Sequence, residues 1–152
     1  LSIIEQVERV NHERKIAMSG RIEESVGGSL RGKTVGILGV TFKPNTDDMR
    51  DAPSLVIVPM LLERGAQVRV FDPQGRKQAE PMLPGVVWCQ SALDVADGAD
   101  AVSVLTEWNE FRALDLKELR RRMKGNALVD LRNIFVGKAA EEAGLAYRGV
   151  GR

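Results

Sequence analysis

The sequence predicts an α/β fold, a three-layer sandwich built on a mostly parallel sheet and preceded by a long N-terminal helix. After residue 33, short β-branched runs alternate with runs of helical periodicity, which is typical of a parallel sheet covered by helices on both faces. Before residue 27, apolar residues recur at helical spacing without a break. Together these two features describe a Rossmann-like domain with a helix in front of it.

The leading helix is predicted by a periodic apolar pattern on one face. Its members are Ile4, Val7, Val10, Ala17, Ile22 and Val26. Gly27-Gly28 closes the helix, so we place a boundary there, with residues 1–28 as a helical segment and residues 29–152 as the domain. This apolar face has to be buried against the domain or against a second copy of the chain. We expect a homodimer contact.

The alternating elements after the boundary can be located from their patterns. Strands are predicted at 34–40, 67–72, 86–88, 99–105, 127–131 and 145–149. Helices are predicted at 53–64, 91–97, 115–123 and 137–143. A sheet of this kind binds its ligand outside the carboxyl ends of the strands, where the loops after the first, fourth and fifth strands converge.

Composition excludes several classes of function. With 22 Lys and Arg against 21 Asp and Glu, the net charge of +1 gives no general field for nucleic acid or for an anionic membrane. The apolar runs fall far short of the roughly 20 residues that cross a bilayer. Cys89 and His12 are the only residues of their types, so neither an internal disulfide nor a Cys/His metal cluster is expected. A reducing cytoplasm fits best, and the absence of a start methionine suggests that the chain continues upstream.

The loop after the first strand carries the strongest chemical signal. A dinucleotide-binding fold would have a short, glycine-rich turn here, but only Gly36 and Gly39 are present and both lie inside the strand pattern. A complete nicotinamide-cofactor site on this domain is therefore not expected. Instead the loop from 42 to 54 is long and polar.

Two cations in this loop suit an anionic ligand. Lys43 offers a point charge and Arg50 a planar fork suited to phosphate, and Pro53 marks a helix start whose free amides add partial positive charge. The alternative is that Arg50 pairs with Asp47 or Asp48 and only fastens an exposed loop. Composition and spacing leave both interpretations open.

Four sequence blocks in this order resemble one known family. They are FKPNTDDMRDAPS after a GILG strand, GAQVRVFDP, GADAVSVLTEWNEFRALD and LVDLRNIF. From about Lys33 to Phe135 the chain closely resembles the C-terminal UDP-binding domain of the UDP-glucose/GDP-mannose dehydrogenase family. The leading helix, with VNHERK, resembles the end of the central helix that links the two halves of these enzymes and forms their dimer.

The resemblance implies roles for individual residues. Phe42 and Lys43 match the pair that contacts the UDP-sugar, and Arg132, in the motif Asp130-Leu131-Arg132-Asn133, matches an arginine of the substrate site. Arg50 ends the T-D-D-x-R motif and matches an arginine close to NAD held by the other domain. No catalytic residue and no metal ligand is expected in this chain, because the family's nucleophilic cysteine and NAD domain precede the segment.

The resemblance also implies an activity for the whole enzyme. It would oxidise the C6 hydroxyl of UDP-glucose twice, through an aldehyde and a cysteine thioester, consuming two NAD and yielding UDP-glucuronate. This chain alone would be inactive and would bind UDP weakly, and its partners would be the UDP-sugar, the NAD-binding half and a second copy. Two alternatives stay open: a related dehydrogenase acting on GDP-mannose or a UDP-N-acetylhexosamine, and a non-catalytic nucleotide-binding module.

Several conspicuous residues have simpler interpretations. Asp72 is interpreted as a turn former, because Pro73 follows it and the glycine loop is missing. Thr106-Glu107-Trp108 is assigned a structural role as a helix cap with a packed indole, and a contact of this segment with the ligand cleft stays open as the alternative. Cys89 is expected to be a packed thiol, and His12 a solvated side chain on the polar flank of the leading helix.

Overall fold

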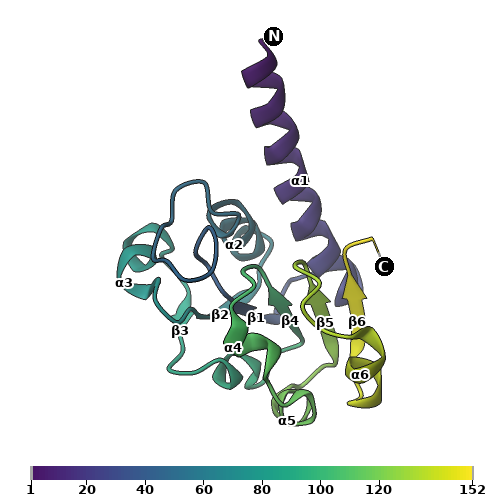
Figure 1. The fold of residues 1–152 in the computed structure, drawn as a ribbon. Coiled ribbons are helices and arrows are strands. Elements are labelled where there is room, and N and C mark those ends of the chain that lie inside the picture. The colour runs from purple at the N-terminus through teal and green to yellow at the C-terminus, as the bar shows by residue number, and fades with distance from the viewer. Residues whose placement is uncertain (1, 152) are drawn as a thin grey trace.

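The computed structural model describes residues 2–151 and contains a six-stranded parallel sheet in the order β3-β2-β1-β4-β5-β6 (Figure 1). The strands are β1 (Thr34–Leu38), β2 (Gln67–Phe71), β3 (Val87–Trp88), β4 (Ala101–Val104), β5 (Ala127–Asp130) and β6 (Ala146–Gly149). Each neighbouring pair is parallel. The predicted α/β fold with a parallel sheet is confirmed.

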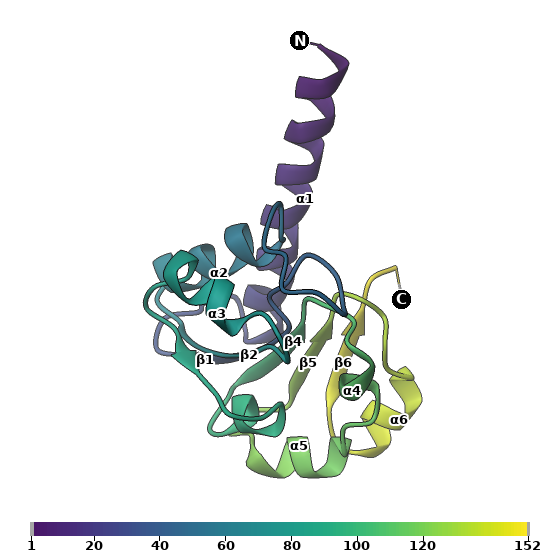
Figure 2. The same ribbon diagram turned by 60° about the vertical axis from the view of Figure 1, so that its left-hand side comes forward.

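Helices cover both faces of the sheet (Figures 1 and 2). They are α1 (Ile3–Ser25), α2 (Ser54–Glu63), α3 (Arg76–Ala79), α4 (Asn109–Arg112), α5 (Leu116–Arg122) and α6 (Gly137–Glu142), with the 3-10 turns η1 (Glu80–Met82) and η2 (Leu93–Ala96). One hydrophobic cluster joins α1 and α2 to the sheet, and a second joins η2, α4, α5 and α6 to it. Consecutive residues Ile37 and Leu38 belong to different clusters, as the alternation of side chains along a strand requires.

The burial of the strands agrees with their positions in the sheet. Every residue of β4 and of β5 is buried, which is typical of central parallel strands covered on both faces. The edge strand β6 instead alternates between exposed and partly buried residues. The two fully buried strands therefore lie inside the sheet, and two of the loops of interest follow them.

The leading helix ends where the sequence predicts. Gly27 and Gly28 both have φ of +95°, and the Gly28 amide donates to the Glu23 carbonyl at 3.0 Å, which closes α1 with a left-handed glycine cap. Ile22 is completely buried in the domain, whereas Ile4 is 72% exposed. The N-terminal half of α1 projects beyond the domain (Figure 1), so the predicted apolar face is buried against the domain only at its C-terminal end.

Two local expectations differ from the structure. The helix predicted over 91–97 is only the four-residue turn η2, which lies so close to β1 that a Cβ on Gly36 would be 2.4 Å from the Val95 carbonyl oxygen. The short elements α3, η1 and α4 were not predicted, because four residues are too few to show helical periodicity.

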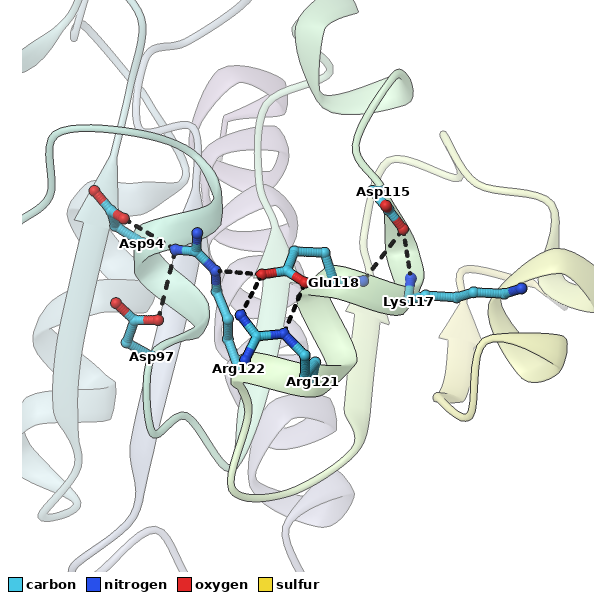
Figure 3. Close-up of polar contacts among 7 residues, drawn as sticks. All are labelled: Asp94, Asp97, Asp115, Lys117, Glu118, Arg121 and Arg122. Atoms are coloured by element: carbon cyan, nitrogen blue, oxygen red, sulfur yellow. Dashed lines mark hydrogen bonds and ion pairs between the residues drawn. The ribbon is translucent and has the colours of Figure 1, made fainter.

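Charged side chains join α5 to η2 (Figure 3). The Arg122 guanidinium lies 3.1 Å from a carboxylate oxygen of Asp94 and 3.7 Å from one of Asp97, and its Nε donates to Glu118 at 3.2 Å. The Gly98 amide, just before β4, donates to the Arg122 carbonyl at 3.0 Å. These contacts therefore lie on the amino side of β4, and they fasten a helix to the sheet at a distance from the carboxyl edge.

Candidate functional site

The candidate site lies where the strand order reverses. β1 lies between β2 and β4, so the chain leaves β1 toward one side of the sheet and returns to β4 on the other. In open parallel sheets, ligands bind outside the carboxyl ends of the strands at such a reversal. Leu38 pairs with Val104 and Val104 pairs with Asp130, so the loops after β1, β4 and β5 begin side by side.

A buried carboxylate fixes the start of the loop after β1. One oxygen of Asp72 accepts hydrogen bonds from the amides of Val40 and Thr41 at 2.8 and 3.1 Å. The other oxygen accepts from the amides of Gln74 and Gly75 at 3.0 and 2.7 Å. The turn-forming interpretation of Asp72 is confirmed, and its carboxylate is already occupied by backbone donors.

The rest of this loop closes on itself and exposes several of its side chains. The Phe42 amide donates to the Asp48 carbonyl at 2.9 Å, and Asn45 and Asp51 have positive φ values of 64° and 58°. Phe42 is half exposed and Lys43 is exposed. None of the ion pairs among residues 2–151 includes Lys43. The loop therefore offers an aromatic ring next to an ammonium group that has no carboxylate partner in the described chain.

Arg50 forms a local pair with Asp48. Its Nε and Nη2 donate to the two oxygens of Asp48 at 3.1 and 2.9 Å, and its amide donates to the same carboxylate at 2.9 Å. The side-chain hydrogen bond from Arg50 is the largest cause that lowers the pKa of Asp48 to about 2. The Arg50 side chain is still 89% exposed. The pairing therefore fastens the loop without burying the guanidinium.

A shallow groove runs along this loop. It has a volume of about 510 Å³ and lies between the loop and the short elements that follow β2. Its lining residues are Thr46, Asp47, Asp48, Met49, Arg50, Gln78 and Met82. Arg50 lies at this groove rather than at the ends of β4 and β5.

The segment after β4 holds the first loop in place. Thr106 Oγ1 donates to the Thr41 carbonyl at 2.8 Å, and the buried indole of Trp108 donates from Nε1 to Thr41 Oγ1 at 3.3 Å. The predicted packing of the Trp108 indole is confirmed. The expected side-chain cap is not formed, because Trp108 occupies the N-cap position of α4 without a capping hydrogen bond.

Arg132 lies on the loop after β5 and pairs with Glu107. Its Nε donates to Glu107 Oε2 at 2.8 Å, and Nη2 donates to the same oxygen. The loop is shaped by Asp130, which accepts from the Phe135 amide at 2.8 Å, and by Asn133, which has a φ of 53° and donates to the Val150 carbonyl. Glu107 was not predicted as a site residue. Its position directly after β4, at the strand reversal, was the available signal.

Arg132 also lies beside the start of α2. A small cavity of about 20 Å³ is lined by Met18, Pro53, Ile57, Leu105, Leu131 and Arg132. These residues come from α1, from α2 and its start, and from the segments after β4 and β5. The guanidinium therefore extends from a place where the helix N-terminus and two strand ends meet.

Cys89 and His12 take no part in this arrangement. Cys89 is buried, and burial raises the pKa of its thiol, which is the environment of an unreactive packed cysteine. His12 is exposed on the projecting half of α1, as predicted. In residues 2–151, no group of three or more His, Cys, Asp or Glu side chains is placed to hold a metal ion. No helix of the same residues is long and apolar enough to span a bilayer.

Comparison with protein families gives one match over most of the domain. Residues 36–137 match the UDP binding domain of the UDP-glucose/GDP-mannose dehydrogenase family. The chain belongs to this family. The UDP-glucose 6-dehydrogenase of Rhizobium meliloti (strain 1021) is 42% identical over 150 residues, which cover 99% of this chain and 34% of that enzyme. TuaD of Bacillus subtilis (strain 168), also a UDP-glucose 6-dehydrogenase, is 33% identical over 99% of this chain and 32% of its own.

Solved structures of two nucleotide-sugar dehydrogenases share the fold. A UDP-glucose dehydrogenase from Pyrobaculum islandicum has a TM-score of 0.74 at 34% identity, over 91% of this chain and 30% of that one. A UDP-D-ManNAc dehydrogenase from Pyrococcus horikoshii has a TM-score of 0.78 at 26% identity, over 95% and 32%. The chain therefore spans about a third of the length of its relatives.

The four predicted site residues all follow strands that end at the carboxyl edge. Phe42, Lys43 and Arg50 lie on the loop after β1, and Arg132 lies on the loop after β5. One strand separates β1 from β5, so the two loops begin about 10 Å apart at the usual strand spacing. Their contacts with a nucleotide sugar and with NAD stay predictions.

Proposed function

We propose that this chain is the UDP-sugar-binding part of an NAD-dependent UDP-glucose 6-dehydrogenase, which converts UDP-glucose to UDP-glucuronate in two successive oxidations. The observation that carries the proposal is the position of the two cations. Lys43 and Arg132 follow the two strands that flank β4, next to the strand reversal. The 42% identity to a UDP-glucose 6-dehydrogenase supports the choice of substrate.

The chemistry of the site suits a sugar diphosphate. The Lys43 ammonium supplies a point charge, and the Arg132 guanidinium supplies a planar donor edge that matches phosphate oxygens. Phe42, half exposed beside Lys43, supplies an apolar contact for the ligand. Holding the diphosphate in this way uses binding energy far from the reacting carbon to position C6 for oxidation. The chain itself contributes no hydride chemistry in this proposal.

The residues present do not fit a complete NAD site on this domain. The strand order is that of a dinucleotide-binding fold, but the turn after β1 is a long polar loop. The Asp72 carboxylate, at the position that would bind a ribose, is taken up by four backbone amides. NAD is therefore proposed to bind mainly to another part of the enzyme, and the exposed Arg50 is proposed to reach it from this side.

The same proposal assigns the projecting helix. We propose that residues 1–28 are the end of a linking helix and that residues 29–152 are the substrate-binding domain. The exposed side chains of Ile4, Val7 and Val10 on α1 form an apolar surface suited to a second copy of the chain in a homodimer. The proposed location of the whole enzyme is the cytoplasm.

One alternative substrate has a specific observation in its favour. The structure of a UDP-D-ManNAc dehydrogenase matches with a TM-score of 0.78, so this fold also serves a UDP-N-acetylhexosamine in a relative. Discrimination by the base and by the sugar can be measured separately. Calorimetry with UDP, GDP, UDP-glucose and UDP-N-acetylmannosamine on the full-length enzyme is the direct comparison.

The proposal predicts a definite ranking in that experiment. UDP should bind and GDP should not compete, and turnover with NAD should be fastest for UDP-glucose. Faster turnover of GDP-mannose or of a UDP-N-acetylhexosamine than of UDP-glucose would show that this other nucleotide sugar is the substrate. A protein that binds UDP but carries no NAD-dependent activity would be the non-catalytic module instead.

A further inference from the structure

We propose that Glu107 is a positioning residue for the diphosphate site, in that it orients the Arg132 guanidinium and leaves one edge of it available to the ligand. This inference deepens the proposed function and rests on Arg132 as a ligand of the nucleotide sugar. It starts from the pattern of contacts that a single three-residue segment makes to the two cation-bearing loops.

Residues 106–108 contact the two loops alternately. Thr106 and Trp108 both hydrogen-bond to Thr41, two residues before Lys43, at 2.8 and 3.3 Å. Glu107, between them, pairs with Arg132 on the loop after β5. The segment therefore joins the Lys43 loop on one side to the Arg132 side chain on the other.

Thr41 also contacts the backbone of Lys43. Its hydroxyl lies 3.1 Å from the Lys43 carbonyl oxygen and 3.2 Å from a carboxylate oxygen of Asp72. Thr41 and Thr106 are 1% exposed, so these hydrogen bonds are shielded from water and hold the backbone firmly. The backbone beside Lys43 is therefore held in place. The Arg132 guanidinium lies at the end of a long, flexible side chain, so a separate contact is needed to orient it.

The geometry of the pair shows what Glu107 leaves free. Both donors that contact it, Nε and Nη2 of Arg132, go to the same oxygen, Oε2. Glu107 therefore occupies the side edge of the guanidinium. A guanidinium has five N–H donors, so the Nη1–Nη2 edge keeps the parallel donors that bind phosphate in a bidentate manner.

The burial of the pair agrees with a positioning role. The Glu107 side chain is 23% exposed and that of Arg132 is 43% exposed, so the glutamate is the more enclosed partner. An arginine fixed in this way loses less side-chain entropy when the ligand arrives. The opposing effect is that a carboxylate reduces the positive charge seen by the diphosphate, and the two effects predict opposite results when Glu107 is removed.

The experiment measures Kd for UDP and KM for UDP-glucose in the full-length enzyme with E107A, E107Q, R132A and the double variant E107A/R132A. We expect E107A to raise both Kd and KM by about tenfold, which is the effect of losing one charge-assisted hydrogen bond. E107Q, whose amide oxygen still accepts from Arg132, should keep most of the affinity. The matched control is E110A, which removes an exposed carboxylate three residues away.

The double variant separates positioning from general damage to the fold. If Glu107 acts through Arg132, E107A should cost almost nothing further in the R132A background. A loss that persists in that background, unchanged or tighter binding in E107A, or an E107Q variant as weak as E107A would each overturn the inference. If R132A binds UDP as tightly as the unchanged enzyme, Arg132 is not part of the site and the proposed function is wrong at this residue. The result for R132A therefore distinguishes a failure of the proposed site from a failure of the role of Glu107.

Discussion

Gly39, just beyond β1, and Thr106, just beyond β4, lie so close together that a Cβ on Gly39 would be 2.5 Å from the Cβ of Thr106. Gly39 also has a φ of +86°, a conformation that favours glycine. The two loops at the strand reversal can therefore approach each other only because residue 39 has no side chain. This contact sets the distance between the Lys43 loop and the segment that contains Glu107.

Replacing Gly39 by alanine should destabilise the fold. We expect the free energy of unfolding to fall by at least about 2 kcal/mol, from the positive φ together with overpacking against Thr106. Urea denaturation measures it. The control is Gly98→Ala, which has a φ of +69° but nothing within 4 Å of the added methyl group, so only the conformational cost of about 1 kcal/mol should remain. Equal losses in both variants would show that the contact with Thr106 is not tight.

Arg132→Ala tests the proposed diphosphate site directly. In the full-length enzyme, kcat/KM for UDP-glucose should fall at least about tenfold, which corresponds to a loss of about 1.5 kcal/mol of transition-state stabilisation, the low end for a hydrogen bond to a charged group. Steady-state kinetics with NAD in excess measures the effect. Arg112→Ala removes an exposed arginine from α4 and should leave kcat/KM unchanged. Unchanged kinetics in Arg132→Ala would remove this residue from the site.

The sequence was informative where the physical cause is local. The glycine pair at 27 and 28 ends α1 because a left-handed cap needs no distant partner, and the buried strands β4 and β5 follow from their mostly apolar character, which only Ser103 and Asp130 interrupt. The position of Arg132 after a central strand could be predicted in the same way. Its pairing with Glu107 could not, because 25 residues separate them and only the register of β4 against β5 brings them together.

The two interpretations of Arg50 show the same limit. Its pairing with Asp48 is local, so the sequence offers it as one of two interpretations, and the structure contains it. The proposed contact of the exposed guanidinium with NAD has no such local cause in the sequence. η2 is a different case, because the Val95 carbonyl oxygen packs directly on Gly36 and long-range packing decides the local conformation.

Glu118 should make the stability of the domain depend on pH. The side-chain hydrogen bonds from Arg121 and then Arg122 lower the pKa of Glu118 from 4.5 to about 2 (Figure 3). A carboxyl whose pKa is lowered in the folded state stabilises it fully above the unfolded pKa, and this contribution is lost as pH falls from about 4.5 to about 2. Tm measured across that range should fall less steeply in Glu118→Gln than in the unchanged protein. Parallel curves would contradict the pairing, and Glu110→Gln is the exposed control.

The leading helix should separate into two halves with different roles. Ile22 is completely buried, so Ile22→Ala should reduce the free energy of unfolding by about 2 to 5 kcal/mol, as expected for a core isoleucine. Ile4 is 72% exposed, so Ile4→Ala should change the free energy of unfolding by no more than about 0.5 kcal/mol in the monomer.

Under the proposed dimer, however, Ile4→Glu combined with Val7→Glu should weaken self-association, because two charges then lie on the apolar surface. Sedimentation equilibrium of the full-length enzyme measures this. If the double variant dimerises as strongly as the unchanged enzyme, the interface does not include the projecting half of α1. If only the double variant loses the dimer, the interface includes it.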